Sequence, residues 1–209
     1  MLEVIPIPNG SFAQNCYLVY HPGHSDTVIV DPGEETARFL AEADRVGRSI
    51  TAIWLTHAHA DHIAGVAGVR HATGAPILIH PADLPLYRGL PEQGLWLGLR
   101  FAAPPPPDRL LADREVLHLG GVGVEVRHAP GHTPGHVCFV APGLVLAGDL
   151  LFEGSIGRSD LPGGDAATLL ASIQRELLSL PDETVVHPGH GPATTIGKER
   201  RTNPFLAGL

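Results

Sequence analysis

The chain has 209 residues, of which 44% are hydrophobic and 17% are charged, so it can bury a substantial core and global disorder is excluded. Its formal net charge is −8, and no basic stripe offers to neutralise phosphates, which argues against nucleic acid as the main partner. No stretch approaches the roughly 18 apolar residues of a membrane span, and the N-terminus lacks a basic leader followed by an apolar run, so we expect a cytoplasmic protein with no membrane partner.

The N-terminal part of the chain alternates strands with helices. Segments rich in Val, Ile, Leu and Tyr predict strands, and turn residues such as Pro8-Asn9-Gly10 separate the first two. The expected strands are residues 2–7, 15–21, 27–30, 50–55 and 77–79. An amphipathic pattern predicts a helix over residues 34–46, which Gly47 ends, and a second helix that begins at Asp61.

Residues 84–108 mix Pro, Gly and bulky apolar residues without a period and end in four consecutive prolines. We expect an ordered loop, or a short helix followed by a rigid proline spacer. The segment carries a group of apolar side chains, which are Leu95, Trp96, Leu97, Leu99 and Phe101. These either form a lid over a substrate cleft or pack on the core.

The C-terminal part returns to strands and helices, with hairpin turns predicted at Gly120-Gly121 and Pro142-Gly143. The expected strands are residues 115–119, 122–128, 137–140, 144–147 and 184–186, and the expected helices are residues 165–180 and 194–203. No polar or charge-rich linker divides the sequence, which predicts a single domain over residues 1–209.

The motif His57-X-His59-X-Asp61-His62 is the densest group of potential metal ligands. It lies where a strand gives way to a helix. Imidazole and carboxylate are good zinc ligands, and zinc with an open coordination position lowers the pKa of its bound water to about 7. His57 and His59 can project together and Asp61 and His62 from the following turn, so we expect two metal half-sites. The alternative is a polar helix cap with incidental histidines.

Three later segments each carry a potential ligand in a Gly-containing turn directly after a strand. These ligands are His132, Asp149 and His190. In sheets flanked by helices, sites collect beyond strand ends, so we expect the three turns, the first motif and the Asp31 turn at one rim of the sheets. Together they supply the ligands that the first motif lacks.

In this order and at these separations, the residues resemble the metallo-β-lactamase superfamily, and most closely its glyoxalase II-type thioester hydrolases. The resemblance spans nearly the whole chain and includes Asp31-Pro32-Gly33, Gly131-His132-Thr133-Pro134-Gly135 and Pro188-Gly189-His190-Gly191-Pro192. It implies an α+β fold, the four-layer αββα sandwich, with two metals at one edge. The implied ligands are His57, His59 and His132 for the first metal, Asp61, His62 and His190 for the second, and Asp149 as the bridge.

The chemistry of such a centre favours thioester hydrolysis. Two divalent ions about 3.5 to 4 Å apart can share a hydroxide as the nucleophile and stabilise an oxyanion, so Asp61 and Asp149 become the catalytic carboxylates through the metals they hold. We expect two zinc ions, with iron or manganese as the other candidates. A thiol leaves with a pKa near 8.5 and needs little proton donation, whereas an amide would need an acid. A small thioester such as S-lactoylglutathione is therefore favoured over a lactam.

Arg158 follows Asp149 by nine residues. In glyoxalase II-like enzymes a basic residue at this offset contacts the carboxylate end of glutathione, and Arg suits bidentate carboxylate recognition. The alternative is a surface Arg paired with Asp160 or Asp165. Pro192 stands where the larger enzymes carry a tyrosine, and their C-terminal helical domain has no counterpart here, which leaves the identity of the thiol open.

Other functions remain compatible with the motifs. A mononuclear iron persulfide dioxygenase of the same fold would use two histidines and a carboxylate, matching His57, His132 and Asp149. A phosphodiesterase or nuclease would also suit the metals, but basic residues are few. A non-catalytic metal-binding module is disfavoured because a structural zinc site is usually closed by four ligands, and seven candidates suit an open two-metal centre. His128, His136 and His187 lie near ligand positions in the sequence and are candidates for orienting a ligand.

Overall fold

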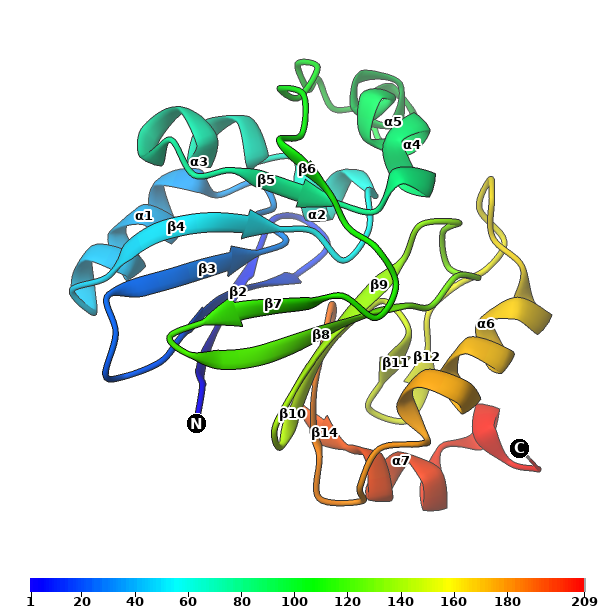
Figure 1. The fold of residues 1–209 in the computed structure, drawn as a ribbon. Coiled ribbons are helices and arrows are strands. Elements are labelled where there is room, and N and C mark those ends of the chain that lie inside the picture. The colour runs from blue at the N-terminus through cyan, green and yellow to red at the C-terminus, as the bar shows by residue number, and fades with distance from the viewer. Residues whose placement is uncertain (209) are drawn as a thin grey trace.

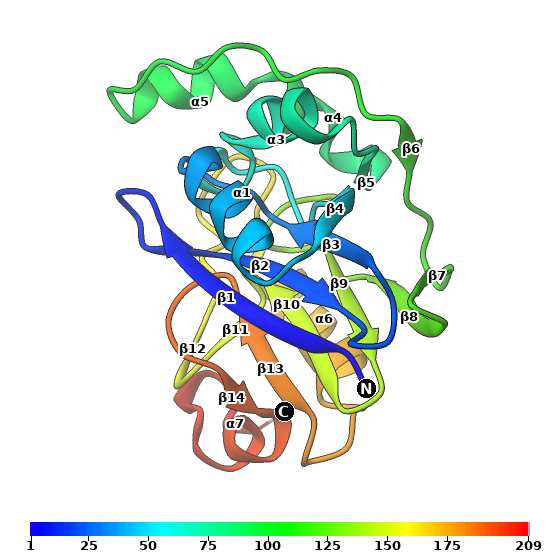
Figure 2. The same ribbon diagram turned by 90° about the vertical axis from the view of Figure 1, so that its left-hand side faces the viewer.

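Two β-sheets face each other in the computed structural model, which describes residues 1–208, and helices cover the outer face of each sheet (Figures 1 and 2). The first sheet consists, in spatial order, of β1 (Glu3–Asn9), β2 (Gln14–Tyr20), β3 (Asp26–Val30), β4 (Ser49–Trp54), β5 (Ile77–Ile79) and β6 (Arg109–Leu110). The second consists of β14 (Thr194–Thr195), β13 (Val185–Pro188), β10 (Leu144–Gly148), β9 (Val137–Ala141), β8 (Val122–His128) and β7 (Val116–Leu119). A small hairpin, β11 (Leu151–Phe152) and β12 (Ser155–Ile156), stands apart from both.

Most helices of the first half connect parallel neighbouring strands. β1 to β3 are antiparallel and β3 to β6 are parallel, and parallel neighbours need crossover connections. The crossovers contain α1 (Thr36–Arg45), α2 (Ala60–Ile63), α3 (Val66–Thr73), α4 (Leu84–Arg88) and α5 (Leu90–Trp96), with a 3-10 turn at Pro81–Asp83. The second sheet is covered by α6 (Ala166–Ser172), the π-helical segment Ile173–Leu177, α7 (Ile196–Thr202) and a 3-10 turn at Pro204–Leu206.

Three separate hydrophobic cores fill the spaces between these layers. Cys16 and Leu18 of β2 belong to the core under α1 and α3, whereas their neighbours Tyr17 and Val19 belong to the core between the sheets. This alternation is the period of two that a strand imposes. A third core lies between the second sheet and α6. Four layers with three cores are the αββα sandwich of a metallo-β-lactamase fold, as the resemblance implied.

The main differences from the expected elements are breaks in helices. The helix expected from Asp61 onward is interrupted between α2 and α3, where the amide of Gly65 donates to the carbonyl of Pro32 and a Cβ on Gly65 would collide with the backbone of Gly33. The helix expected over 165–180 turns π-helical at Ile173–Leu177. The one expected over 194–203 begins with the short strand β14.

The region 84–108 takes the second of its two expected forms, short helices followed by an extended proline-rich segment. Its first half forms α4 and α5, and its proline-rich half runs extended towards β6. The hydroxyl of Tyr87 in α4 donates a hydrogen bond to the carbonyl of Pro105 in this extended segment, at 2.8 Å. In Figure 2, α5 lies at the outer edge of the layer formed by the helices of the first sheet. No helix among residues 1–208 combines the length and hydrophobicity needed to cross a bilayer.

Candidate metal centre

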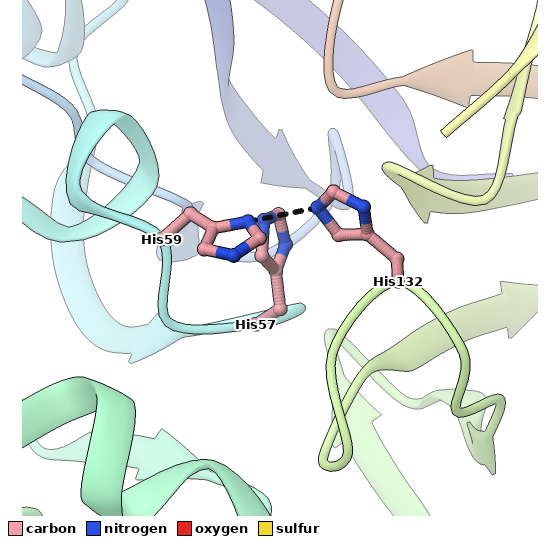
Figure 3. A group of neighbouring side chains, drawn as sticks. All are labelled: His57, His59 and His132. Atoms are coloured by element: carbon pink, nitrogen blue, oxygen red, sulfur yellow. Dashed lines mark hydrogen bonds between the residues drawn. The ribbon is translucent and has the colours of Figure 1, made fainter. Parts of the chain in front are cut away.

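The seven predicted ligands meet at one edge of the two sheets. The ligand atoms of His57, His59 and His132 lie within 4.8 Å of one another, and Figure 3 shows His57 and His59 on the loop after β4 facing His132 on a loop from the other half of the molecule. His59 Nδ1 and His132 Nε2 are 2.8 Å apart. The ligand atoms of Asp61, His62 and His190 form a second group and likewise lie within 4.8 Å of one another.

The Asp149 carboxylate lies between the two groups. Its Oδ2 atom is 3.5 Å from His132 Nε2 in the first group and 3.6 Å from His190 Nε2 in the second. Its Oδ1 atom is 3.3 Å from His62 Nε2. One carboxylate thus faces both groups, which is the placement that a bridging ligand requires.

Several buried polar atoms at this edge lack hydrogen bonds, which bears on whether the edge suits metal ions. His57 Nε2, His62 Nε2 and Asp149 Oδ1 are buried and have no well-aligned hydrogen bond among residues 1–208, although the last two atoms lie 3.3 Å apart. Buried polar atoms are nearly always paired, so three unpaired ones at a single centre require an explanation. Imidazole nitrogens with a carboxylate oxygen form a donor set suited to a divalent ion, and the residues fit such ions.

Hydrogen bonds on the far side of the rings fix which nitrogen faces the centre. His132 Nδ1 donates to the carbonyl of Arg158 at 2.7 Å, and His190 Nδ1 donates to the carbonyl of Phe12 at 3.1 Å. A carbonyl can only accept, so Nδ1 carries a proton in both rings and Nε2 is the nitrogen that faces the centre. His62 Nδ1 likewise faces Asp31 Oδ2, at 3.1 Å.

Asp31 connects the ends of two strands at this edge. It accepts hydrogen bonds from the backbone amide and the hydroxyl of Thr56, at 2.7 and 2.6 Å, in addition to the contact with His62. Its φ of +51° lies in the left-handed region, which is uncommon for a residue with a side chain. Such strain persists when surrounding contacts compensate for it, and the Asp31 carboxylate makes those contacts.

Sequence reasoning missed Asp83, a buried carboxylate that ties the two ligand loops together. Asp83 accepts from the amides of Ala58 and Gly135, at 2.9 and 2.6 Å, and from the hydroxyl of Thr133 at 2.8 Å. Burial raises the pKa of its carboxyl group despite these three donors. Asp83 stands in a short turn with no distinguishing pattern, so only the fold reveals it.

His136 has one of the orienting roles that the sequence suggested. Its Nε2 atom accepts a hydrogen bond from the Asp149 amide at 3.0 Å, and its ring stacks on His57 with centroids 5.0 Å apart. The other two histidines suggested for such a role pack elsewhere, since His128 stacks on His80 and His187 lies edge-on to Tyr17.

Burial and mutual proximity set the charge states of the centre. Burial, reinforced by neighbouring histidines, holds the pKa of His57 well below its usual value and lowers that of His59 to about 3. Burial opposes ionisation of Asp149, but His62, His132 and His190 outweigh it, and the pKa of the carboxyl group falls below its ordinary range. Neutral imidazoles and an ionised carboxylate are the forms in which these groups bind metals.

His62 and His190 differ from the first pair. Burial opposes protonation of His62, but Asp149 and Asp61 outweigh it and raise its pKa. Burial likewise acts against His190, whose pKa is raised by its hydrogen bond to Asp61 at 3.2 Å. A cation at this place would take over the electrostatic role of those protons.

A cleft of about 310 Å³ opens above the centre. Its floor contains five of the seven predicted ligands, which are His59, Asp61, His132, Asp149 and His190. The expected apolar lid is divided: Trp96 and Leu97 line the cleft, whereas Phe101 packs on the core beneath the helices and Leu95 is 68% exposed outside the cleft.

Arg158 matches features of both interpretations considered for it. Its guanidinium group makes a bidentate ion pair with Asp160, at 2.8 and 2.9 Å, which is the surface pairing. The same side chain also lines the cleft, and its backbone carbonyl orients His132.

Comparisons with known proteins agree with this geometry. Residues 9–190 match the metallo-beta-lactamase superfamily. The hydroxyacylglutathione hydrolase GloC of Haemophilus influenzae is 38% identical over 214 residues, which cover 98% of this chain and 97% of GloC. The crystal structure of TTHA1623 in a di-iron-bound form is 48% identical, with a TM-score of 0.90, and the match covers 97% of this chain and all of TTHA1623. The BLEG-1 B3 metallo-beta-lactamase is 38% identical, with a TM-score of 0.92 and full coverage of both chains.

Proposed function

The chain belongs to the metallo-β-lactamase superfamily, and on that premise we propose that it is a binuclear metallohydrolase that cleaves a small thioester, with S-lactoylglutathione as the first substrate to test. The observation that carries the proposal is the position of the Asp149 carboxylate, which faces His132 on one side and His62 and His190 on the other. The similarity to a hydroxyacylglutathione hydrolase over nearly the whole of both chains supports the reaction class.

The proposed ligands follow the two groups. We assign His57, His59 and His132 to one ion, Asp61, His62 and His190 to the other, and Asp149 to both. Divalent ions held in this way lower the pKa of coordinated water and polarise a carbonyl group, which is the chemistry that hydrolysis needs. We propose zinc as the native metal, and the di-iron form of TTHA1623 makes iron the first alternative to measure.

The acids that line the cleft favour a thioester over an amide. Among the described residues that line it, the only carboxylates are Asp61 and Asp149, and both face histidine nitrogens of the centre. As proposed ligands of the two ions, neither is free to protonate a leaving group. A thiolate departs without such help, because the thiol pKa is near 8.5, whereas an amine does not.

The test combines elemental analysis of the purified protein with assays on S-lactoylglutathione and on a β-lactam. We expect two divalent ions per chain, hydrolysis of the thioester, and little or none of the β-lactam. Asp149→Asn should lower the metal content to one ion or fewer and reduce kcat/KM by at least about 100-fold, because removal of a ligand charge affects both ions.

Asp44→Ala is the matched control, because Asp44 is an exposed acid on α1, and it should keep both the metal and the activity. Unchanged metal content and activity in Asp149→Asn would refute the ligand assignment. One iron per chain with oxygen consumption on glutathione persulfide would replace the hydrolase with a persulfide dioxygenase.

A further inference from the structure

The walls of the cleft are apolar on three sides. They consist of Phe12 from the turn between β1 and β2, Leu86, Trp96 and Leu97 from the α4–α5 region, and Leu161 and Pro162 from the loop before α6. Phe12 is 47% exposed, Trp96 72% and Leu97 44%, although each borders the cleft. Large apolar side chains gathered in the open around a concave site mark a surface that a ligand covers.

The apolar wall is attached to the centre rather than carried on a loose loop. The carbonyl of Phe12 accepts the Nδ1 proton of His190 at 3.1 Å. On the opposite side, Gln93 of α5 accepts from the amide of Ala60 at 3.0 Å and donates to the carbonyl of Ala58 at 2.9 Å, within the first ligand motif. The Phe12 turn and α5 are therefore both hydrogen-bonded to the loops that carry the candidate ligands.

Lys and Arg side chains are scarce in the walls of the cleft. Among the described residues that line it, Arg158 is the only Lys or Arg, and its guanidinium group is already paired with Asp160. Glutathione is a peptide thiol that carries carboxylates and an ammonium group. Transfer of such groups from water to an apolar wall without partners is unfavourable, whereas an aliphatic or aromatic group gains free energy there.

We propose that the preferred substrate is a thioester with an extended apolar arm, aliphatic or aromatic, that packs against Trp96, Leu97 and Phe12. The inference rests on the proposed thioester hydrolysis and specifies its substrate class. In the reaction, water adds to the carbonyl carbon and the C–S bond breaks, so that a carboxylic acid and a thiol are released. The apolar arm belongs either to the acyl group or to the thiol, and the test below separates these two sources.

The experiment uses two series of neutral thioesters with the metal-loaded protein. In the first series the acyl group of an N-acetylcysteamine thioester grows from acetyl through butanoyl and hexanoyl to octanoyl. In the second the acyl group stays acetyl and the thiol grows from ethanethiol to octanethiol. In one series kcat/KM should rise by about fourfold per added methylene until the arm outgrows the cleft, which corresponds to the transfer of one CH₂ group from water.

Trp96→Ala should remove most of that gain. We expect kcat/KM for the longest favoured substrate to fall by about tenfold or more, and by a clearly smaller factor for the shortest substrate. Leu95→Ala is the matched control, because Leu95 is the adjacent apolar residue of α5 but does not line the cleft. Phe12→Ala tests the opposite wall and should act in the same direction.

The outcomes separate this inference from the proposed function. Thioester hydrolysis with flat profiles in both series, or with S-lactoylglutathione as the best substrate, would overturn the apolar arm and leave the hydrolase standing. A Leu95→Ala variant as defective as Trp96→Ala would also count against it. Failure to hydrolyse any thioester would remove the proposed function itself.

Discussion

Asp31 is not one of the seven candidate ligands, but it orients two of them. Its carboxylate orients His62 directly and reaches His57 through Thr56, whose hydroxyl lies 3.0 Å from His57 Nδ1. One side chain thus acts on both halves of the centre. Groups that orient metal ligands in this way typically contribute 10- to 100-fold to metal affinity.

We expect Asp31→Ala to weaken zinc binding by about 10- to 100-fold, because His62 loses its orienting acceptor. The measurement is a competition titration of metal-free protein with a chromophoric chelator. Asp44→Ala serves again as the exposed control. An affinity equal to that of the wild type would mean that packing alone orients His62.

The backbone at Gly189 passes so close to the candidate ligands Asp149 and His62 that no side chain fits there. A Cβ atom at this position would collide with Asp149 Oδ1 and lie 2.8 Å from His62 Cε1, and both groups are fixed by their own contacts. Gly189→Ala should therefore displace Asp149 and lower the metal content to one ion or fewer per chain, with an unchanged far-UV circular dichroism spectrum. Gly23→Ala is the control, since its Cβ would make only ordinary contacts of 3.4 Å with His21. A fully metallated Gly189→Ala protein would contradict this account.

At the scale of elements, the buried side chain of Gln93 connects α5 to the ligand loop by hydrogen bonds. Gln93 is 8% exposed and bonds to Ala58, Ala60 and the carbonyl of Leu86. Gln93→Ala removes these bonds and leaves buried backbone groups unpaired, so it should lower the free energy of unfolding by about 1 to 3 kcal/mol. Urea unfolding measures this loss, and faster hydrogen exchange at the Ala60 amide would locate it. Glu92→Ala, an exposed neighbour, should leave both unchanged, and equal stability of the two variants would refute the role of Gln93.

The elements also show what sequence patterns can and cannot predict. β5 and β8 agree with the expected bounds, because the continuous apolar run of β5, the alternating burial within β8 and the flanking turn residues are local signals. The break at Gly65 is not local, since it depends on the backbone of Gly33 approaching from another crossover. In the 84–108 region the sequence left a loop and a short helix as alternatives, because Gln93 looks like an ordinary polar residue until the fold brings Ala58 and Ala60 to it.

The candidate ligands are easier to predict from the sequence than the residues that hold the ligand loops in place. Four ligand-type residues within six positions are a signal in themselves, and Gly-containing turns after strands marked His132, Asp149 and His190. Asp83 offers no such signal, because its three donors come from segments remote from it in the chain. Residues that bind through their own chemistry are visible in a sequence, whereas residues that act through tertiary contacts are not.

At the scale of the whole molecule, the centre joins the two halves of the sandwich. The first motif follows β4 of the first sheet, whereas His132, Asp149 and His190 follow strands of the second. Each group of candidate ligands therefore draws on both sheets, and Asp149 of the second sheet lies 3.3 Å from His62 of the first half. Ions bound here would cross-link the sheets at one edge, in addition to the core that includes the Trp54–Phe139 contact between them.

We therefore expect bound metal to stabilise the entire fold. An ion that binds only the folded state stabilises it by about 2.7 kcal/mol when its free concentration is 100 times Kd. For a chain of this length that corresponds to a rise in Tm of about 5 to 11 °C. Scanning calorimetry of the zinc-loaded protein before and after EDTA treatment measures the difference, and added zinc should restore the original Tm. Asp149→Asn should lose most of the dependence because it removes the carboxylate shared by both groups, whereas His71→Ala, an exposed histidine on α3, should retain it. A Tm that is the same with and without EDTA would mean that the sheets are held together by their core alone.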